Sequence, residues 1–197
     1  NIFGTAVGTK MVRFRTAAII ASVFVIIGAV FAGGGASKTL TELGAVNTLA
    51  GAFMCAFAAA VTVYWMVSSS IPVSTSQSIV GAIIGWNCYS NKPTDYGILS
   101  EIVSTWILCP LLSGIIAICL YGLTRVWLKH AKIHLLRLDC YTRIGLILTG
   151  AFGAYALGAN NIGNVMGVFV DANPLQSISW HGFSLSATQL LFLIGAL

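Results

Sequence analysis

The sequence predicts an all-α fold, a polytopic transmembrane helical bundle with inverted repeats and broken helices. Hydrophobic residues make up 57% of the 197 residues, charged residues only 8%, and the mean hydropathy is +0.91. A soluble globular domain carries about 25% charged residues, so this composition excludes a water-soluble enzyme and a disordered or fibrous chain. The apolar runs also exceed the roughly 9–11 residues of a transmembrane β-strand, which favours helices.

Charged residues divide the chain into uncharged stretches over residues 16–37, 43–91, 102–124, 144–170 and 172–197. A membrane-crossing helix needs about 20 predominantly apolar residues, so the 49-residue stretch 43–91 must hold two. We therefore expect spanning helices near residues 16–31, 44–67, 72–88, 98–123 and 144–157, and a last one from about Leu185.

Basic residues fall into two segments that the positive-inside rule places in the cytoplasm. Segment 10–15 has three Lys or Arg and no acid, and segment 125–143 has five against one Asp. Four crossings between them put both segments inside, provided that residues 72–88 traverse the membrane. Because the basic residues lie between apolar runs, their distribution indicates topology, and no nucleic-acid partner is expected.

A short internal repeat suggests how the crossings are organised. Residues 1–7 (NIFGTAV) share Asn, Gly and the final Val with residues 164–170 (NVMGVFV). Chance similarity of small apolar segments is the alternative, but five expected crossings between the copies would make the second one inverted. Inverted repeats are typical of secondary transporters, with the site at the repeat interface near the midplane.

A hydroxyl-rich segment, residues 68–78 (SSSIPVSTSQS), interrupts the longest uncharged stretch. Pro72 is expected at the first position of a helix, whose exposed N–H groups and dipole favour an anion. The further donors expected there are the hydroxyls of Ser74, Thr75 and Ser76 and the amide of Gln77. The alternative is that these hydroxyls bond back to their own helix or hold helices together.

A carboxamide-rich segment, residues 158–164 (GANNIGN), is expected to break an otherwise apolar helix. Unwound backbone at membrane depth survives only where it lines a cavity or is buried in protein. Asn side chains offer carbonyl oxygens to a hard cation and N–H donors to an oxyanion. The alternative is a Gly/Asn helix C-cap at a membrane exit.

At these segments the sequence resembles the PiT family of inorganic phosphate transporters, whose two halves each carry a GAND-type and a PVSTTH-type motif. Residues 158–164 resemble the second-half GAND-type motif, and residues 72–82 resemble the first-half PVSTTH-type motif. Residues 1–8 resemble the tail of the first GAND-type motif, and segment 125–143 matches the link between halves. The resemblance extends over nearly the whole chain, in order.

The resemblance implies secondary active uptake of inorganic phosphate, coupled to Na⁺ or H⁺, by a multi-pass protein of the cell membrane that forms a homodimer in the lipid bilayer. It implies substrate contacts from Ser74, Thr75, Ser76, Asn160 and Asn161. It implies cation contacts, or support of the substrate ligands, from Gln77, Asn164 and Asn1. Neither a bound cofactor nor a structural metal is expected.

The same resemblance divides the chain into three parts. Residues 1–124 would form the first-half repeat, residues 125–143 a basic cytoplasmic linker, and residues 144–197 the start of the second-half repeat. The chain begins at Asn1 without a Met and stops at Leu197 inside an apolar run, so we expect an internal piece of a longer protein.

The sequence departs from the family pattern where an acid of the GAND-type motif is replaced by Asn161, and where Thr-Thr-His is Thr75-Ser76-Gln77. The first change removes a carboxylate that could bind a cation or a proton, so the coupling ion stays open. Two alternatives remain: a carrier of another oxyanion such as sulfate, and a non-transporting membrane protein on the same scaffold. No nucleophile–base pair suggests an enzyme. His130 and His134 at i, i+4 could bind a metal, but a solvated basic face explains them without one.

Overall fold

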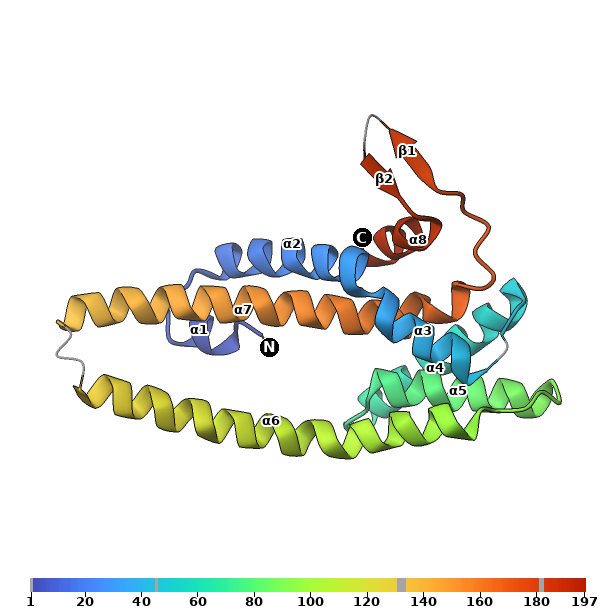
Figure 1. The fold of residues 1–197 in the computed structure, drawn as a ribbon, viewed down its shortest axis with the longest axis horizontal. Coiled ribbons are helices and arrows are strands. Elements are labelled where there is room, and N and C mark those ends of the chain that lie inside the picture. The colour runs from blue at the N-terminus through green and yellow to red at the C-terminus, as the bar shows by residue number, and fades with distance from the viewer. Residues whose placement is uncertain (1, 45, 131–133, 181–182) are drawn as a thin grey trace.

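The computed structural model describes residues 2–44, 46–130, 134–180 and 183–197, and it is helical almost throughout (Figure 1). The elements in chain order are α1 (Gly4–Gly8), α2 (Phe14–Ala32), α3 (Gly34–Leu43), α4 (Leu49–Ser68), α5 (Thr75–Tyr89), α6 (Tyr96–His130), α7 (Leu135–Met166), the 3₁₀ turn η1 (Gly167–Phe169), β1 (Ile178–Trp180), β2 (Phe183–Leu185) and α8 (Ala187–Ala196). The two short strands pair antiparallel, with Ile178 opposite Leu185. The predicted all-α class is confirmed.

Four helical segments are long and apolar enough to cross a membrane. They are α2, α4, α6 and the run Leu135–Phe169, which joins α7 to η1. They correspond to four of the expected spans, those near residues 16–31, 44–67, 98–123 and 144–157. Helix α6 has 35 residues and is roughly 52 Å long, so it extends beyond the hydrocarbon core of about 30 Å.

The helix expected over residues 72–88 begins later than predicted. Ser74 is its N-cap, because the Ser74 Oγ accepts a hydrogen bond from the Gln77 backbone N–H at 3.4 Å. Pro72 therefore lies before the cap in a non-helical segment, and its predicted place at the first helical position is wrong. With 15 residues, α5 is roughly 22 Å long and too short to cross the core by itself.

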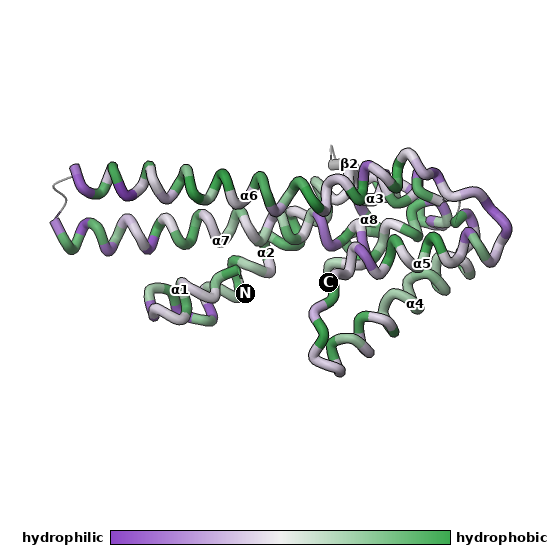
Figure 2. The backbone as a smooth tube through the Cα atoms, turned by 90° about the horizontal axis from the view of Figure 1, so that it is seen from below, coloured by the Kyte–Doolittle hydropathy of each residue, from purple (hydrophilic) through white to green (hydrophobic). Residues whose placement is uncertain are grey.

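Helices α4 and α5 form an antiparallel hairpin. The Cys55 Sγ donates to the Ala82 carbonyl at 3.8 Å, and one turn earlier Gly51 packs against the Trp86 ring. Residues 69–74 connect the two helices at the tip, where Ser70 has a φ of 57°. The hairpin lies at the end of the molecule opposite the α6–α7 connection (Figures 1 and 2). The tip of the hairpin, which holds the hydroxyl-rich segment, therefore lies toward the middle of the molecule.

Helices α2 and α7 run parallel and approach each other at backbone distance. A Cβ at Gly28 would overlap the Tyr155 carbonyl, and a Cβ at Gly158 would overlap the Val25 carbonyl. Glycine at both crossing points is what lets the two backbones touch, as is common where membrane helices pack. Phe192 of α8 is fully buried beside this pair, in a cluster with Ala29 and Ile162.

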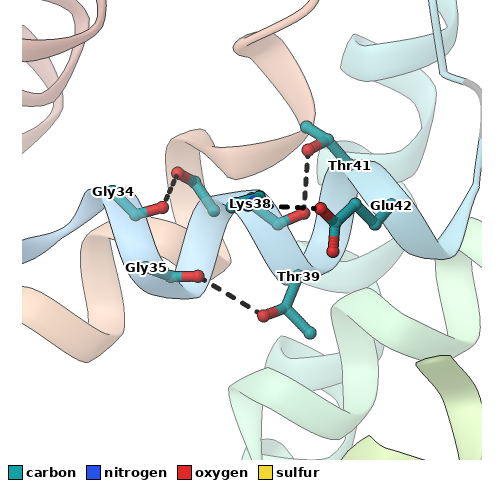
Figure 3. Close-up of polar contacts among 7 residues, drawn as sticks. Gly34, Gly35, Lys38, Thr39, Thr41 and Glu42 are labelled. Carbon is teal, nitrogen blue, oxygen red and sulfur yellow. Dashed lines mark hydrogen bonds and ion pairs between the residues drawn. The ribbon is translucent and has the colours of Figure 1, made fainter.

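Helix α3 was not predicted. Its buried residues, Ser37, Leu40 and Leu43, recur every three positions, and the helix packs against α7 and η1. Its exposed face carries an ion pair between the Lys38 Nζ and the Glu42 Oε1 at 3.7 Å, shown in Figure 3 with the neighbouring hydroxyl contacts. The segment is rich in glycine and polar residues, which is why apolar runs alone did not reveal it.

A buried carboxamide lies where the loop after α3 crosses the last turn of α5. Asn87 is fully buried, and its Nδ2 donates to the Thr94 Oγ1 at 3.0 Å. Within the described residues, the Asn87 Oδ1 has no hydrogen-bond partner. Gly44 packs so closely that a Cβ there would lie 2.6 Å from the Asn87 Nδ2.

The basic segments lie in the same half of the molecule. Val12 and Ala17, around the start of α2, cluster with Leu146 and Ile147, about three turns into α7, so α2 begins in the half of the molecule that holds the end of α6 and the start of α7 (Figure 1). In the described part of residues 125–143, the expected linker is the end of α6 and the start of α7 rather than a loop.

The two histidines of this region do not share a helix face. His130 ends α6, and its Nδ1 lies 2.9 Å from the Val126 carbonyl, whereas His134 is the N-cap of α7. Their i, i+4 spacing therefore does not place them on one helix face. Across the described ranges, no group of three or more His, Cys, Asp or Glu side chains could hold a metal ion.

Candidate functional site

One hydrogen bond joins the two polar segments singled out in the sequence. The Asn164 Nδ2 on α7 donates to the Ser76 Oγ on α5 at 2.9 Å, across 88 positions of sequence. The same Nδ2 also lies 3.4 Å from the Asn160 Oδ1, one turn earlier on α7. The first turn of α5 and the last turns of α7 therefore form a single polar cluster, defined by Ser76, Asn160 and Asn164.

The carboxamides of this cluster project from an unbroken helix. Helix α7 continues through residues 158–164 to Met166, so both the predicted break and the alternative C-cap are wrong. The glycines of this segment serve packing instead: Gly158 lies against the α2 backbone and Gly163 against Ala36 of α3. Asn160 and Asn164 are four residues apart and so share one face of the helix.

The first turn of α5 supplies donors of its own. Thr75 and Ser76 occupy the first two helical positions, whose N–H groups have no partner within a helix. The positive end of the α5 dipole lies at the same turn. Because Ser76 touches Asn164, this end of α5 lies beside the carboxamides of α7.

A cavity of about 520 Å³ adjoins the cluster between α4, α5 and α7. Thr75 and Asn164 line it, and three small residues of α4, Ala56, Ala59 and Ala60, leave room for it. Tyr64 and Ser68 of α4 add polar groups: Ser68 is the first residue of the hydroxyl-rich segment, whereas no motif or spacing singles out Tyr64. No charged side chain is among the described residues that line the cavity.

The other predicted residues lie apart from the cluster. Ser74 and Gln77 line a separate cavity of about 410 Å³ with Thr62 and Met66. Asn161 is exposed, and its side chain makes no hydrogen bond in the described part of the chain. Asn1 lies outside the described residues. Of the eight predicted residues, the structure brings together Thr75, Ser76, Asn160 and Asn164.

This arrangement can bind a small oxyanion through neutral donors. Hydroxyl, carboxamide and backbone N–H groups of two helices lie side by side here, and a helix N-terminus favours negative charge. No Lys or Arg contributes to the cluster, so a bound anion would keep its charge unless a cation accompanied it.

Comparison with known proteins places the chain among transporters. The sequence model of the phosphate transporter family matches residues 1–196. Sodium-dependent phosphate transporter 1 of Homo sapiens is 33% identical over 139 residues, which cover 65% of this chain and 20% of that protein. The Mus musculus protein of the same name is 34% identical over 143 residues, again 65% and 20%.

A more distant relative aligns along the entire chain. A candidate phosphate permease of Methanocaldococcus jannaschii is 27% identical over 197 residues, which are 100% of this chain and 57% of that protein. The chain thus spans about a fifth of the length of the animal relatives and little more than half of the archaeal one. No solved structure matches it.

Proposed function

Because the chain belongs to the phosphate transporter family, we propose that it carries inorganic phosphate across a membrane by cation-coupled symport. The family and its relatives are named for transport, and the chain is an integral membrane protein rather than an enzyme. The observation that supports the proposal most directly is the Asn164–Ser76 hydrogen bond, because it joins the carboxamide segment of one repeat to the hydroxyl segment of the other.

The proposed substrate ligands follow from this cluster. Ser76 and Asn160 hold phosphate with their side chains, and Thr75 adds its hydroxyl and the N–H of the first helical position. Ser74 and Asn161 remain predicted substrate ligands that the described geometry does not bring into the cluster. Gln77 and Asn1 likewise remain predicted cation contacts.

Coupling to a cation follows from electrostatics. An unpaired anion in a low-dielectric site is costly, and no described Lys or Arg lines the cavity beside the cluster. A co-bound cation offsets much of that cost, and carboxamide and hydroxyl oxygens are suitable ligands for a hard cation. The animal relatives are named sodium-dependent, which supports Na⁺ over H⁺ as the coupling ion.

The surroundings of the protein are proposed on similar grounds. We place it in the cell membrane with residues 125–143 in the cytoplasm, because both basic segments lie in the same half of the molecule (Figure 1). Helix α6 buries only Ile102, so its apolar surface is available to lipid or to a second copy in a homodimer. Residues 1–124 and 144–197 are proposed as the two inverted repeats.

The test is uptake of labelled phosphate by the full-length chain in proteoliposomes. Imposed Na⁺ and proton gradients are compared, with unlabelled sulfate as competitor. Accumulation driven by the Na⁺ gradient and not suppressed by sulfate is expected. Uptake that ignores both gradients contradicts symport, and strong suppression by sulfate makes the protein a general oxyanion carrier. Binding of phosphate without accumulation indicates a non-transporting protein on this scaffold.

A further inference from the structure

The amide hydrogens of Asn164 are both committed. Its Nδ2 donates to the Ser76 Oγ at 2.9 Å and to the Asn160 Oδ1 at 3.4 Å. An amide nitrogen carries two hydrogens and no acceptor lone pair, so Asn164 acts on each neighbour only as a donor. These two contacts determine what the neighbours can offer a ligand.

Ser76 and Asn160 are left as donors. A hydroxyl has a single proton, and because the Ser76 Oγ accepts from Asn164, that proton points elsewhere. Ser76 donates no side-chain hydrogen bond within the described part of the chain. The Asn160 Oδ1 is occupied by Asn164, and within the same residues its Nδ2 is unused and carries two further donors.

The carbonyl oxygen of Asn164 is the acceptor that remains. In the described ranges, no group donates a hydrogen bond to the Asn164 Oδ1, and the residue is half-buried at the edge of the cavity lined by Thr75. An acceptor beside a bound oxyanion forms a hydrogen bond with a P–OH group and repels a bare oxygen. Hydrogen phosphate and hydrogen arsenate carry such a group at neutral pH, whereas sulfate does not.

We propose that Asn164 is the positioning and specificity-determining residue of the site: its amide turns Ser76 and Asn160 into donors, and its carbonyl selects a protonated oxyanion over sulfate. The inference rests on the proposed function. It assigns discrimination to a neutral carboxamide, at the edge of a cavity whose described lining carries no charged side chain.

The test compares variants of the full-length chain in proteoliposomes. The KM for phosphate and the Ki values for sulfate and arsenate are measured for wild type, Asn164→Ala and Ser76→Ala. Asn47→Ala, at an exposed loop position, is the control. The ratio of sulfate Ki to phosphate KM reports discrimination and does not depend on how much protein is folded.

Asn164→Ala is expected to raise the phosphate KM about tenfold and to lower this ratio about tenfold, because it removes the acceptor that only phosphate uses. Ser76→Ala removes a donor that both anions use, so it raises KM and Ki together and leaves the ratio within about twofold. Arsenate follows phosphate in every variant, and Asn164→Gln, which keeps the amide, restores most of the ratio. Asn47→Ala behaves as wild type.

An unchanged ratio in Asn164→Ala, with wild-type protein that takes up phosphate, overturns this inference and leaves the proposed function intact. Absence of phosphate uptake by wild type contradicts the proposed function and this inference with it. If Asn164→Ala does not reach the liposomes, Asn164→Ser gives the same comparison, because its side chain is too short to place an acceptor at the Oδ1 position. An unchanged ratio there is equally decisive.

Discussion

Ser74 and Ser76 lie two positions apart but make different contacts. The Ser74 Oγ accepts the Gln77 N–H and caps α5, and the side chain lines the cavity shared with Thr62. The Ser76 Oγ accepts from Asn164 on another helix. Neighbouring hydroxyls of one motif thus divide between capping a helix and binding across helices, because Ser74 precedes α5 in extended conformation whereas Ser76 lies within its first turn.

Ser74→Ala is expected to lower the free energy of unfolding by about 1 kcal/mol, the usual effect of losing an N-cap. It should raise the phosphate KM less than Ser76→Ala does. Thermal unfolding in detergent and phosphate uptake measure the two effects, with Ser104→Ala on the exposed face of α6 as control. A KM increase equal to that of Ser76→Ala would place Ser74 in contact with phosphate.

At the scale of elements, the contact between α2 and α7 depends on glycines that have no open space around them. Gly158 faces the Val25 carbonyl, whereas Gly145, on the same helix, has no neighbour close to where its Cβ would lie. The same substitution at these two positions should therefore have opposite effects. Both substitutions gain the same helix propensity, so the difference in their effects on stability arises from packing.

Gly158→Ala is expected to destabilise the protein by about 1–3 kcal/mol through overlap with the α2 backbone. Gly145→Ala should be neutral or stabilising by up to about 1 kcal/mol, because alanine favours the helix and meets no obstacle. Unfolding temperatures of the two purified variants provide the comparison. Equal shifts would mean that α2 and α7 do not touch at Gly158.

The sequence predicted the long apolar helices and the interruption between α4 and α5, because length, hydropathy and a proline with clustered serines act locally. It did not predict that α7 runs through residues 158–164. Gly and Asn each disfavour a helix by less than about 1 kcal/mol, and the contacts of Gly158 and Gly163 with α2 and α3 outweigh this. Local sequence also did not predict the hydrogen bond between Asn164 and Ser76, because 88 positions separate the two residues.

For the whole molecule, the arrangement of helices determines which ends lie together. Helices α2 and α7 run parallel and α6 ends beside the start of α7, so the basic segments lie in the same half of the molecule, while the turn after α5 lies at the opposite end (Figure 1). Helix α5 is too short to cross the hydrocarbon core alone. Because it runs antiparallel to α4, it nevertheless brings the chain back to the end of the molecule where α4 begins.

Two native cysteines test this topology. Cys88, in the last turn of α5, and Cys140, in the first turns of α7, are both exposed and lie at opposite ends. A membrane-impermeant maleimide added to intact cells is expected to label Cys88 and not Cys140, and to label both after permeabilisation. Cys88→Ser and Cys140→Ser identify each signal. Labelling of Cys140 from outside would invert the proposed orientation.

The close approach of Gly44 to Asn87 also bears on how the sequence can evolve. Asn87 is fully buried and holds the loop at Thr94, and any side chain at position 44 would occupy the space that this carboxamide fills. A larger residue at position 44 therefore requires that Asn87 and Ile83 shift or become smaller, because both side chains would lie 2.6 Å from the added Cβ. Substitutions at positions 44 and 87 are therefore expected to covary among related sequences, although 42 other residues lie between them.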